Sequence, residues 1–483
     1  MTSSAKSESG PAENRQRSGS DAPSVAEING FVDRFNWRER SRIHCPGEGV
    51  IDRVSADDWI SRLRRPDKTV NLPGLTLVPA NAPLAALLNA QRQAGSGSPF
   101  CIADAAVVTR VAQEFNRRNE FRFSFNGQSG GGAKDSNSSG APSFVTVSGG
   151  TTGFPRLVAR THASWIFSFE HLHALGGTRE GDRVGVLGSL GYSIHAYAAF
   201  EALHLGADVL LLSGMRPDRQ MVALAQMDAT VIYATPTQLR LLGQKGNVEP
   251  APAIRRVMIG GAACDRTTLE AVERQFPNAE IYGFYGSSET SFVSMAKLDS
   301  GQTGQGQLFP RVEVMIRPAP KTAIEGPQTG EIWVRSPMVF SGYVGPGAKR
   351  CPESWFDGYF FTGDVGWLGP GGTLAVVGRS DRIVRVAERS LALDEIEAQL
   401  SAAPGVRHVA AVAVPDHLRG SRLTVAVKLE SGTSLADVTN YWRGRFDRHL
   451  VSSDIRELDP WPSLPSGKTD YEAIRRLFSE SGG

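Results

Sequence analysis

The sequence lacks most features of secreted, membrane and nucleic-acid-binding proteins. Its 483 residues include only four cysteines, Cys45, Cys101, Cys264 and Cys351, and none has metal-ligand spacing. Such isolated thiols are typical of a reducing compartment, so we expect a cytoplasmic protein. No apolar run is long enough for a membrane span, and the N-terminus has no apolar signal core. The net charge of only +2 gives no support for a nucleic-acid partner.

The composition is instead that of a large globular protein. Hydrophobic residues make up 41% of the chain and charged residues 21%. The length exceeds that of one ordinary domain. The polar, serine-rich start is expected to be disordered. We predict a disordered tail over 1–30, an N-terminal domain over 31–380 and a C-terminal lid domain over 381–483.

Strands and helices alternate along the middle of the chain, which predicts an α/β fold with parallel sheets flanked by helices. The predicted strands are Leu75–Val78, Arg183–Leu187, Asp208–Leu212, Thr230–Tyr233, Ile254–Ile259 and Glu280–Phe284. The predicted helices are Pro83–Ala94, Ala196–Leu205, Asp218–Met227 and Arg266–Gln275.

The pattern changes in the second half. Short β segments over Gln307–Val377 indicate a β-barrel-like or antiparallel subdomain. The last hundred residues have a small α+β pattern of their own. Its elements are a helix over Leu393–Ser401, strands over His408–Val414 and Arg422–Leu429, and a helix over Ser434–Leu450.

One segment, Ser148–Arg156, concentrates glycines, hydroxyls and a cation directly after the β-rich run Phe144–Val147. Glycines let several backbone N–H groups point at one anion, and hydroxyls and a guanidinium add donors. We therefore predict a phosphate cradle after a strand, with a plain surface loop as the alternative. Phe154 follows Gly153 where a Walker loop requires Gly-Lys, so the segment is not a Walker loop. The cradle residues are Ser148, Gly149, Gly150, Thr151, Thr152, Gly153 and Arg156.

Further short motifs follow the cradle in a fixed order: Tyr285–Thr290, Gly330–Ile332, Thr362–Asp364, Gly378–Asp381 and Pro465–Lys468. Together these motifs resemble the adenylate-forming superfamily of acyl- and aryl-CoA ligases, aryl-acid AMP ligases and peptide-synthetase adenylation domains. The resemblance covers roughly residues 40 to 478. The sequences of Ser148–Gly153 and Arg160–His162 are most similar to those of the aryl-acid AMP ligases.

The resemblance implies a reaction and its cofactors. A carboxylic acid attacks the α-phosphate of ATP, pyrophosphate leaves, and the acyl-adenylate passes its acyl group to a thiol of coenzyme A or of a carrier protein. Both reactants are anionic, so the protein has to supply positive charge, Mg²⁺ and orientation.

The resemblance also implies roles for individual residues. Glu289 is the Mg²⁺ carboxylate, with Thr151 as a second ligand, since hard cations prefer oxygen. Asp364 accepts the ribose hydroxyls with help from Arg379, and Lys468 neutralises charge in the transition state. The remaining nucleotide contacts are Gly260, Gly261, Ala262, Gly283, Tyr285, Gly286 and Ser288. Each of three residues also has a purely structural alternative. Tyr285 could be a core side chain, Arg156 an exposed loop arginine and Lys468 a lysine of the solvent-exposed tail.

The chain departs from the family pattern in several places. Arg156 replaces a lysine, and Ser288 replaces a threonine. Asp381 is the predicted hinge of the lid, but the loop after it, Arg385–Ser390, lacks the expected glycine, which puts thioester formation in doubt.

No Pro-x-x-His element precedes the substrate helix. Tyr192 and His195 are the candidate substrate residues, and a helix-start structural role for His195 is the alternative. No aspartate for an α-amine is evident, which favours an aryl or other non-amino acid.

Three hypotheses remain open from the sequence. The first is adenylation followed by transfer to a thiol. The second keeps adenylation but uses a non-thiol acceptor such as an amine, or an unusual oxyanion substrate. The third is a nucleotide-binding homologue without turnover, against which Lys468 and Glu289 both argue.

Overall fold

The predicted strands and helices are divided between two units. The computed structural model describes residues 14–17, 41–46, 49–52, 70–72, 75–80, 86–87, 90, 99–118, 122–125, 144–148, 156–243, 249–299, 305–318, 329–345, 354–386, 389–416, 420–444, 454–463 and 469–480. The larger unit comprises Gly19–Pro310 and Ser336–Glu353. The smaller unit comprises Met1–Ser18, Arg311–Arg335 and Ser354–Gly483.

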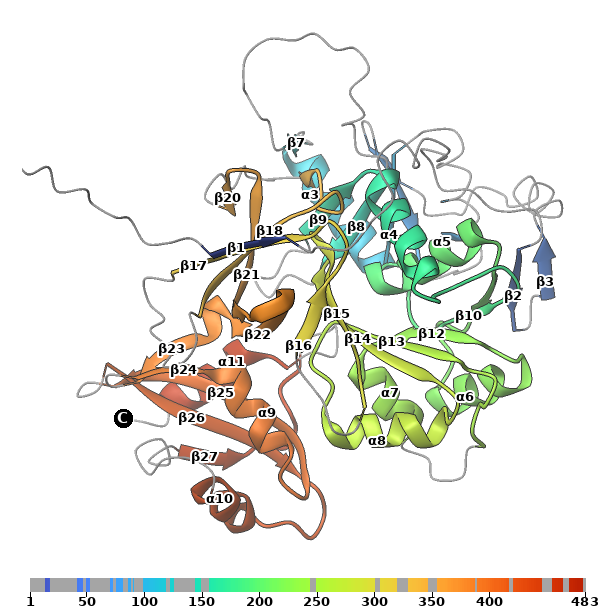
Figure 1. The fold of residues 1–483 in the computed structure, drawn as a ribbon. Coiled ribbons are helices and arrows are strands. Elements are labelled where there is room, and N and C mark those ends of the chain that lie inside the picture. Colours follow the sequence, from blue (N-terminus) through green and yellow to red (C-terminus); the bar gives the residue numbers. More distant parts are fainter. Residues whose placement is uncertain are drawn as a thin grey trace, which may run out of the picture. The chain divides into compact units, whose positions relative to one another are not determined.

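A mainly parallel sheet dominates the larger unit (Figure 1). From one side to the other its strands are β16 (Gln305–Leu308), β15 (Ser291–Lys297), β14 (Glu280–Ser287), β13 (Arg256–Ile259), β12 (Val231–Ala234), β10 (Arg183–Val186), β11 (Asp208–Leu211), β2 (Arg42–Cys45) and β3 (Gly49–Asp52). The strands from β14 to β2 are parallel. The inner strands β10, β11, β12 and β13 are rich in buried apolar residues, as expected of strands covered on both faces.

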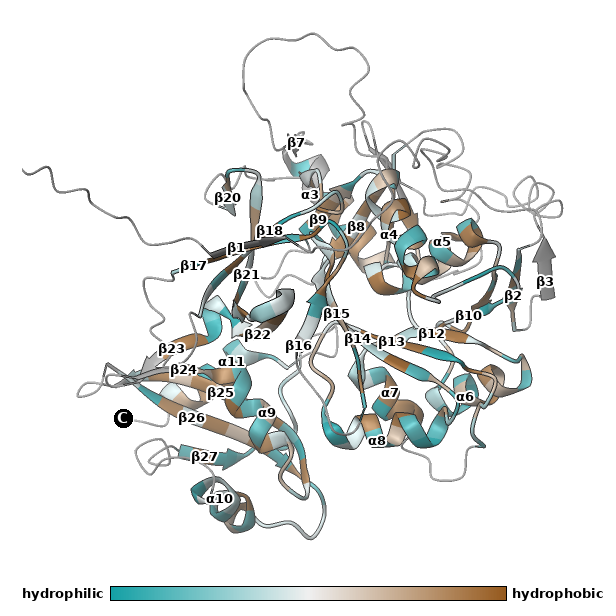
Figure 2. Cartoon of the chain, in the orientation of Figure 1, coloured by the Kyte–Doolittle hydropathy of each residue, from teal (hydrophilic) through white to brown (hydrophobic). Residues whose placement is uncertain are grey.

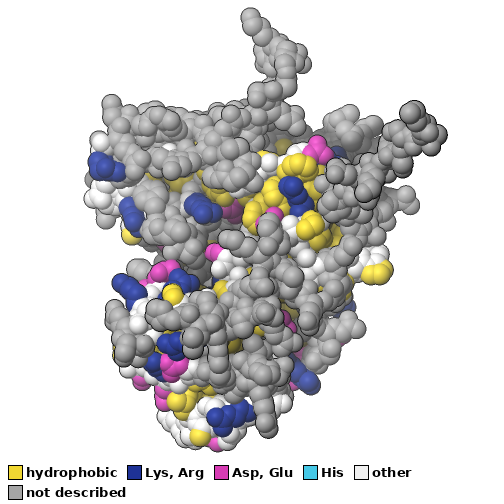
Figure 3. All heavy atoms as spheres, turned by 90° about the vertical axis from the view of Figure 1, so that its left-hand side faces the viewer, with side chains coloured by type: hydrophobic (Ala, Val, Ile, Leu, Met, Phe, Trp, Pro, Cys, Tyr) yellow, Lys and Arg dark blue, Asp and Glu magenta, His cyan; other side chains and the backbone are white. Residues whose placement is uncertain are grey.

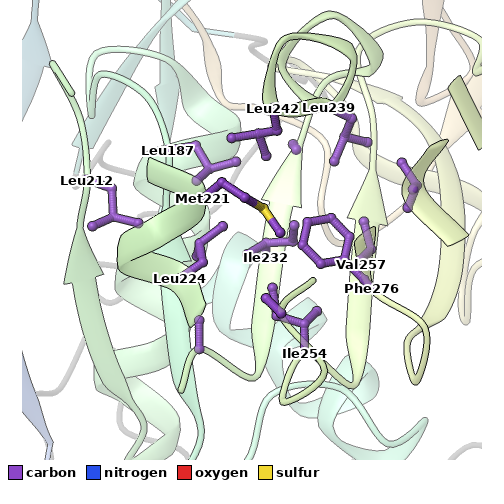
Figure 4. Packing of buried hydrophobic residues seen from close by; sticks show 14 of the residues in the cluster. Leu187, Leu212, Met221, Leu224, Ile232, Leu239, Leu242, Ile254, Val257 and Phe276 are labelled. Carbon is purple, nitrogen blue, oxygen red and sulfur yellow. The ribbon is translucent and has the colours of Figure 1, made fainter. Parts of the chain in front are cut away.

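Helices cover both faces of that sheet. On one face, α6 (Pro217–Gln226), α7 (Pro236–Gly243) and α8 (Arg266–Gln275) enclose a core in which Met221, Leu224, Ile232 and Phe276 pack together (Figure 4). These helices carry hydrophilic as well as hydrophobic residues (Figure 2), and Val222 and Leu241 are exposed on them. On the other face lies α5 (Ser193–Leu205), which contacts β10, β11 and β12. Nearly every side chain of α5 from Ala196 onward is buried, as in a helix with no solvent face.

A second sheet in the same unit carries the strand before the predicted cradle. Its order is β4 (Val70–Leu72), β5 (Leu75–Pro79), β6 (Phe100–Ala103), β8 (Phe144–Ser148), β9 (Arg156–Arg160), β19 (Gly342–Gly345) and β7 (Arg122–Phe125). Helices α3 (Ala105–Arg118) and α4 (His162–Ala174) accompany it, and α5 contacts β8 as well as the first sheet. Thus α5 touches both sheets.

The smaller unit begins with antiparallel strands, as the short β segments predicted. The order is β1 (Asn14–Arg17), β17 (Glu313–Arg317), β18 (Gly330–Arg335), β21 (Tyr359–Leu368) and β22 (Thr373–Arg379), with β20 (Trp355–Phe356) beside β21. Short 3-10 turns η2 (Pro370–Gly372) and η3 (Ser380–Arg382) precede and follow β22. In the predicted disordered tail, the structure describes only β1, a strand paired with β17.

The last part of the smaller unit is the predicted α+β domain. A hairpin of β23 (Ile383–Val386) and β24 (Arg389–Ala392) precedes a sheet of β25 (Val406–Asp416), β26 (Gly420–Leu429) and β27 (Asp454–Glu457). Helices α9 (Leu393–Ser401) and α10 (Leu435–Arg443) bury Leu400 and Trp442 in one core, and α11 (Tyr471–Glu480) buries Phe478 in a second. Basic and acidic side chains of the described residues are interspersed on the face in Figure 3.

The element predictions are confirmed with shifted ends. Helix α8 has the predicted bounds, whereas α5 begins three residues before the predicted Ala196 and β14 runs on to Ser287. The predicted helix Pro83–Ala94 lies mostly outside the described residues, as does the end of Ser434–Leu450. The prediction missed α3, α4, α7 and α11. In the part of the chain that is described, every helix is too short or too polar to cross a lipid bilayer.

Candidate nucleotide-binding site

The candidate site begins at the carboxyl edge of the parallel sheet. Because β12, β13 and β14 run parallel, the residues that follow them meet at one edge, where ligands of α/β folds commonly bind. Gly260 and Gly261 follow β13 directly. A side chain at Gly260 would lie 2.2 Å from the Phe284 ring, and Gly261 has a φ of +84°, so both positions require glycine. Gly261 and Ala262 are exposed and leave an open strip of backbone.

Glu289 sits on the tight turn between β14 and β15. The Ser287 hydroxyl accepts hydrogen bonds from the Glu289 and Thr290 amides at 3.1 and 3.2 Å. The Ser287 amide donates to the Thr290 hydroxyl at 3.0 Å. A side chain at Gly286 would lie 1.7 Å from the Ser291 carbonyl oxygen, so the turn closes only with glycine there. These local bonds fix the backbone on which Glu289 is mounted.

Two neighbouring strands hold this turn from outside. Arg160, at the end of β9, is fully buried and donates to the Ser288 carbonyl, the Met338 carbonyl and, at 2.7 Å, the Ser291 hydroxyl. Burial lowers the pKa of Arg160 to about 9, and the charge of Glu289 partly offsets that effect. The Tyr343 hydroxyl, on β19, donates to Oε1 of Glu289 at 3.0 Å.

In the smaller unit, Asp364 and Arg379 form the predicted pair. They face each other across β21 and β22, and Nη1 of Arg379 lies 3.3 Å from Oδ1 of Asp364. Gly363 has a φ of +80°, and a side chain there would lie 2.8 Å from the Arg379 guanidinium. The Asp364 side chain is 14% exposed and that of Arg379 50% exposed. The two motifs, on consecutive strands of the chain, therefore form one polar pair.

Comparison with known proteins decides the family. The family model for the AMP-binding enzyme matches residues 74–344, and that for the AMP-binding enzyme C-terminal domain matches residues 395–468. The chain belongs to the AMP-binding enzyme family. It is an AMP-forming acid ligase of the adenylate-forming superfamily, as the motifs predicted.

Curated relatives of this AMP-binding enzyme include acyl-CoA and aryl-AMP ligases. An uncharacterized acyl-CoA ligase of Bacillus subtilis is 27% identical over 344 residues, which are 70% of this chain and 69% of the relative. The salicyl-AMP ligase / salicyl-S-ArCP synthetase of Mycobacterium tuberculosis is 27% identical over 361 residues. That match spans 71% of this chain and 62%, less than two thirds, of the relative's own length.

Solved structures share the fold at lower identity. ATP-bound MatB from Rhodopseudomonas palustris superposes with a TM-score of 0.75 at 17% identity, covering 94% of this chain and 98% of that one. The o-succinylbenzoate CoA synthetase of Bacillus subtilis, with its acyl-adenylate, gives 0.73 at 19% identity, covering 90% and 95%. The predicted fold class is thereby confirmed.

In this AMP-binding enzyme, the cradle loop and Lys468 lie outside the residues that the structure describes. The cradle residues concerned are Gly149, Gly150, Thr151, Thr152 and Gly153. The residues flanking the loop are described. Ser148 ends β8, the strand predicted before the cradle, and pairs with Arg156, the first residue of β9, a strand that was not predicted. The exposed Arg156 guanidinium lies 5.8 Å from the centre of the Tyr343 ring.

The first turn of α5 lies beside the Glu289 turn. The sequence analysis did not predict this contact. The Ser193 and Ser288 hydroxyls are 2.9 Å apart. Tyr192 caps α5, is 41% exposed and bridges to Val147 of β8. Burial and the charge of Asp104 raise the pKa of Tyr192. Ser193 carried no motif signal, because a serine at a helix start is common in any protein.

His195 is buried and contacts Gln238 of α7. Its Nε2 lies 3.0 Å from the amide nitrogen of the Gln238 side chain. The imidazole packs against Gly188, where a side chain would come within 2.3 Å of His195 Nε2. Gln238 Oε1 accepts from the Thr235 amide, so its amide nitrogen donates to His195. Burial lowers the pKa of His195 to about 4. His195 is thus a buried, neutral partner of α7, and a substrate role for it stays a prediction.

The predicted hinge residue Asp381 is exposed and lies in η3. The next residue, Arg382, is bound to Asp394 and Glu397 of α9, and its guanidinium lies 4.1 Å from the centre of the Tyr471 ring. Ala387 and Glu388, where the family's glycine was expected, lie outside the described residues. A hinge role for Asp381 stays a prediction.

No group of three metal-ligating side chains occurs among the residues that the structure describes. One oxygen of Glu289 nevertheless suits a hard cation. Its Oε1 accepts from Tyr343, while Oε2 has no hydrogen-bond partner among the described residues. A single carboxylate that leaves most positions to water and phosphate is the usual protein contribution to Mg²⁺–nucleotide binding.

Proposed function

We propose that this enzyme activates an aryl or other non-amino carboxylic acid with ATP and Mg²⁺ and then transfers the acyl group to a thiol. The observation that carries the proposal is the Glu289 turn, a carboxylate on a rigid turn at the carboxyl edge of the parallel sheet. The relatives that make acyl-CoA or salicyl-AMP support the substrate class. The acceptor is coenzyme A or the phosphopantetheine of a carrier protein.

Different residues of the chain have different roles in adenylation. Glu289 and Thr151 hold Mg²⁺, which when bound offsets the negative charge of the phosphates. Thr151, Thr152 and Arg156 bind the departing pyrophosphate. Asp364 and Arg379 bind the ribose and set its orientation. Lys468 neutralises the charge that grows as the substrate carboxylate attacks the α-phosphate.

The adenine end uses the open backbone beyond β13. Gly261 and Ala262 are exposed, so a planar base can lie against the strip without meeting side chains. Tyr285 contributes its ring beside this strip, and Gly283, Gly286 and Ser288 shape the strand and turn next to it.

Acid-dependent exchange of pyrophosphate into ATP tests the first half-reaction. A panel of aryl, fatty and amino acids should give exchange with one aryl or other non-amino class. Lys468→Ala should lower the exchange rate about a hundredfold or more. Lys428→Ala is the matched control, because Lys428 pairs only with the exposed Asp459 in the described structure. Exchange that persists undiminished in Lys468→Ala would contradict the mechanism.

A non-thiol acceptor is the second candidate, because the loop after Asp381 lacks the family's glycine and would place extra side-chain bulk beside an incoming pantetheine arm. Val386 pairs with Arg389, so only Ala387 and Glu388 connect the strands. Neither of these two residues is glycine. Mass spectrometry of products formed with coenzyme A and amines both present separates the candidates: a thioester supports transfer to a thiol, and an amide supports the alternative.

A further inference from the structure

The Glu289 carboxylate has a single side-chain partner among the described residues, the Tyr343 hydroxyl at 3.0 Å. The bond uses only Oε1. A glutamate on a half-exposed turn would otherwise rotate freely about its side-chain bonds, at a cost when a ligand fixes it. The bond to Tyr343 removes that freedom before any ligand binds.

The backbone under Glu289 is fixed independently of Tyr343. The Phe340 amide donates to the Glu289 carbonyl at 2.7 Å, and Arg160 donates to the Ser288 carbonyl. Loss of the Tyr343 hydroxyl would therefore leave the turn in place. The change would be confined to the direction of the carboxylate.

We propose that Tyr343 is a positioning residue for adenylation, whose hydroxyl fixes one oxygen of Glu289 so that the other is presented to the metal. The inference rests on the proposed function, in which Glu289 ligates Mg²⁺. Hydrogen-bonding partners of metal ligands orient those ligands and tune their affinity.

Tyr343 is itself held firmly enough for this task. It lies on β19, which pairs with β9 on one side and β7 on the other. Its ring packs edge-on against Phe340, with centroids 4.9 Å apart. A tyrosine hydroxyl carries a proton at neutral pH, so Tyr343 is the donor in this bond.

The Tyr343 ring lies beside two motifs that are proposed to bind the phosphates and the metal, the cradle hairpin and the Glu289 turn. The Arg156 guanidinium lies 5.8 Å from the centre of the Tyr343 ring, and Glu289 accepts a hydrogen bond from the Tyr343 hydroxyl. Tyr343 thus contacts the end of the hairpin that carries the cradle loop as well as the metal carboxylate.

The test compares Tyr343→Phe with the wild-type protein by titration calorimetry. The probe is the α,β-methylene analogue of ATP, bound at low and at saturating free Mg²⁺ without any acid. We expect Mg²⁺ to tighten analogue binding in the wild type. In Tyr343→Phe the Mg²⁺ concentration needed for half of that effect should rise about tenfold. In the exchange assay, the apparent KM for Mg²⁺ should rise similarly while kcat at saturating Mg²⁺ changes less than about threefold.

Tyr359→Phe is the matched control, because the Tyr359 hydroxyl also donates to a glutamate, Glu313, at 3.0 Å. It should leave the Mg²⁺ dependence unchanged. The proposal fails if Tyr343→Phe has the wild-type Mg²⁺ dependence, or if Tyr359→Phe shifts it equally. If the wild type itself binds the analogue without any effect of Mg²⁺, the metal role of Glu289 in the proposed function fails instead.

Discussion

Two glutamates in the larger unit each accept a hydrogen bond from a tyrosine hydroxyl, yet their surroundings differ completely. Glu201, in the middle of α5, is fully buried, and its Oε2 accepts from Tyr233 at 2.7 Å and Thr178 at 2.8 Å. Burial raises the pKa of Glu201 to about 7 despite those bonds. Glu289 lies on a half-exposed turn, within the field of the buried Arg160.

The difference shows that burial and turn geometry, more than the tyrosine–glutamate bond, decide what a carboxylate can do. In the core between two sheets, the carboxyl group is cut off from ligands and is expected to affect stability through its proton. On the turn, one oxygen is fixed and the other is open to a ligand. The first arrangement is structural, and the second is suited to metal binding.

The largest expected effect separates the two glutamates by activity. Glu289→Gln should lower acid-dependent pyrophosphate exchange about a hundredfold or more, because the proposed metal ligand loses its charge. Glu201→Gln should leave the exchange rate within about threefold of wild type at neutral pH. Equal losses in the two variants would show that the two glutamates do not differ in their role in adenylation.

The second effect concerns the arginine beside Glu289. Arg160→Met removes three donors from buried carbonyl and hydroxyl partners, so we expect the free energy of unfolding to fall by about 3 kcal/mol. Denaturant unfolding measures this. Arg256→Met is the control, since Arg256 is also buried and bonds Glu280 and the Leu175 carbonyl at the opposite edge of the sheet. Both variants should be destabilised, but only Arg160→Met should also weaken Mg²⁺-dependent nucleotide binding.

The third effect is the pH dependence of stability caused by Glu201. Its pKa in the folded chain, about 7, exceeds its ordinary value of 4.5. The stabilisation is therefore complete below about pH 4.5 and is lost as the pH rises through 7. Between pH 5 and 8 the wild type should lose about 2 kcal/mol relative to Glu201→Gln. His195 is present in both proteins, so its own titration cancels, and parallel stability curves would contradict the prediction.

The smallest effect is at Ser193, the first residue of α5. Ser193→Ala removes the partner of the Ser288 hydroxyl, and one such bond contributes about 1 kcal/mol. Thermal unfolding should detect a small decrease, accompanied by a modest rise in the KM for ATP. Ser401→Ala, an exposed serine at the end of α9, is the control and should leave the KM unchanged.

Motif order and periodicity predicted much of this protein. The alternating apolar runs predicted β10 to β14, and α8 was predicted to the residue. Asp364 and Arg379 were predicted as a pair from motifs alone, and they face each other across two strands. Helices α4 and α7 were missed, because α4 has buried serines among its apolar residues, which blurs its apolar face, and α7 is only two turns long.

The sequence by itself determined the family, the order of the elements and the residue types at the nucleotide site, because these depend on local periodicity and short motifs. Only the tertiary structure decided which partners hold Glu289. Arg160 and Tyr343 stand 129 and 54 residues away from it in the chain, and no local pattern signals that strands β9 and β19 pair beside its turn. Burial acts in the same way: Glu201 and Glu289 are the same residue type, and only the packing around each decides whether it keeps a proton or presents an oxygen.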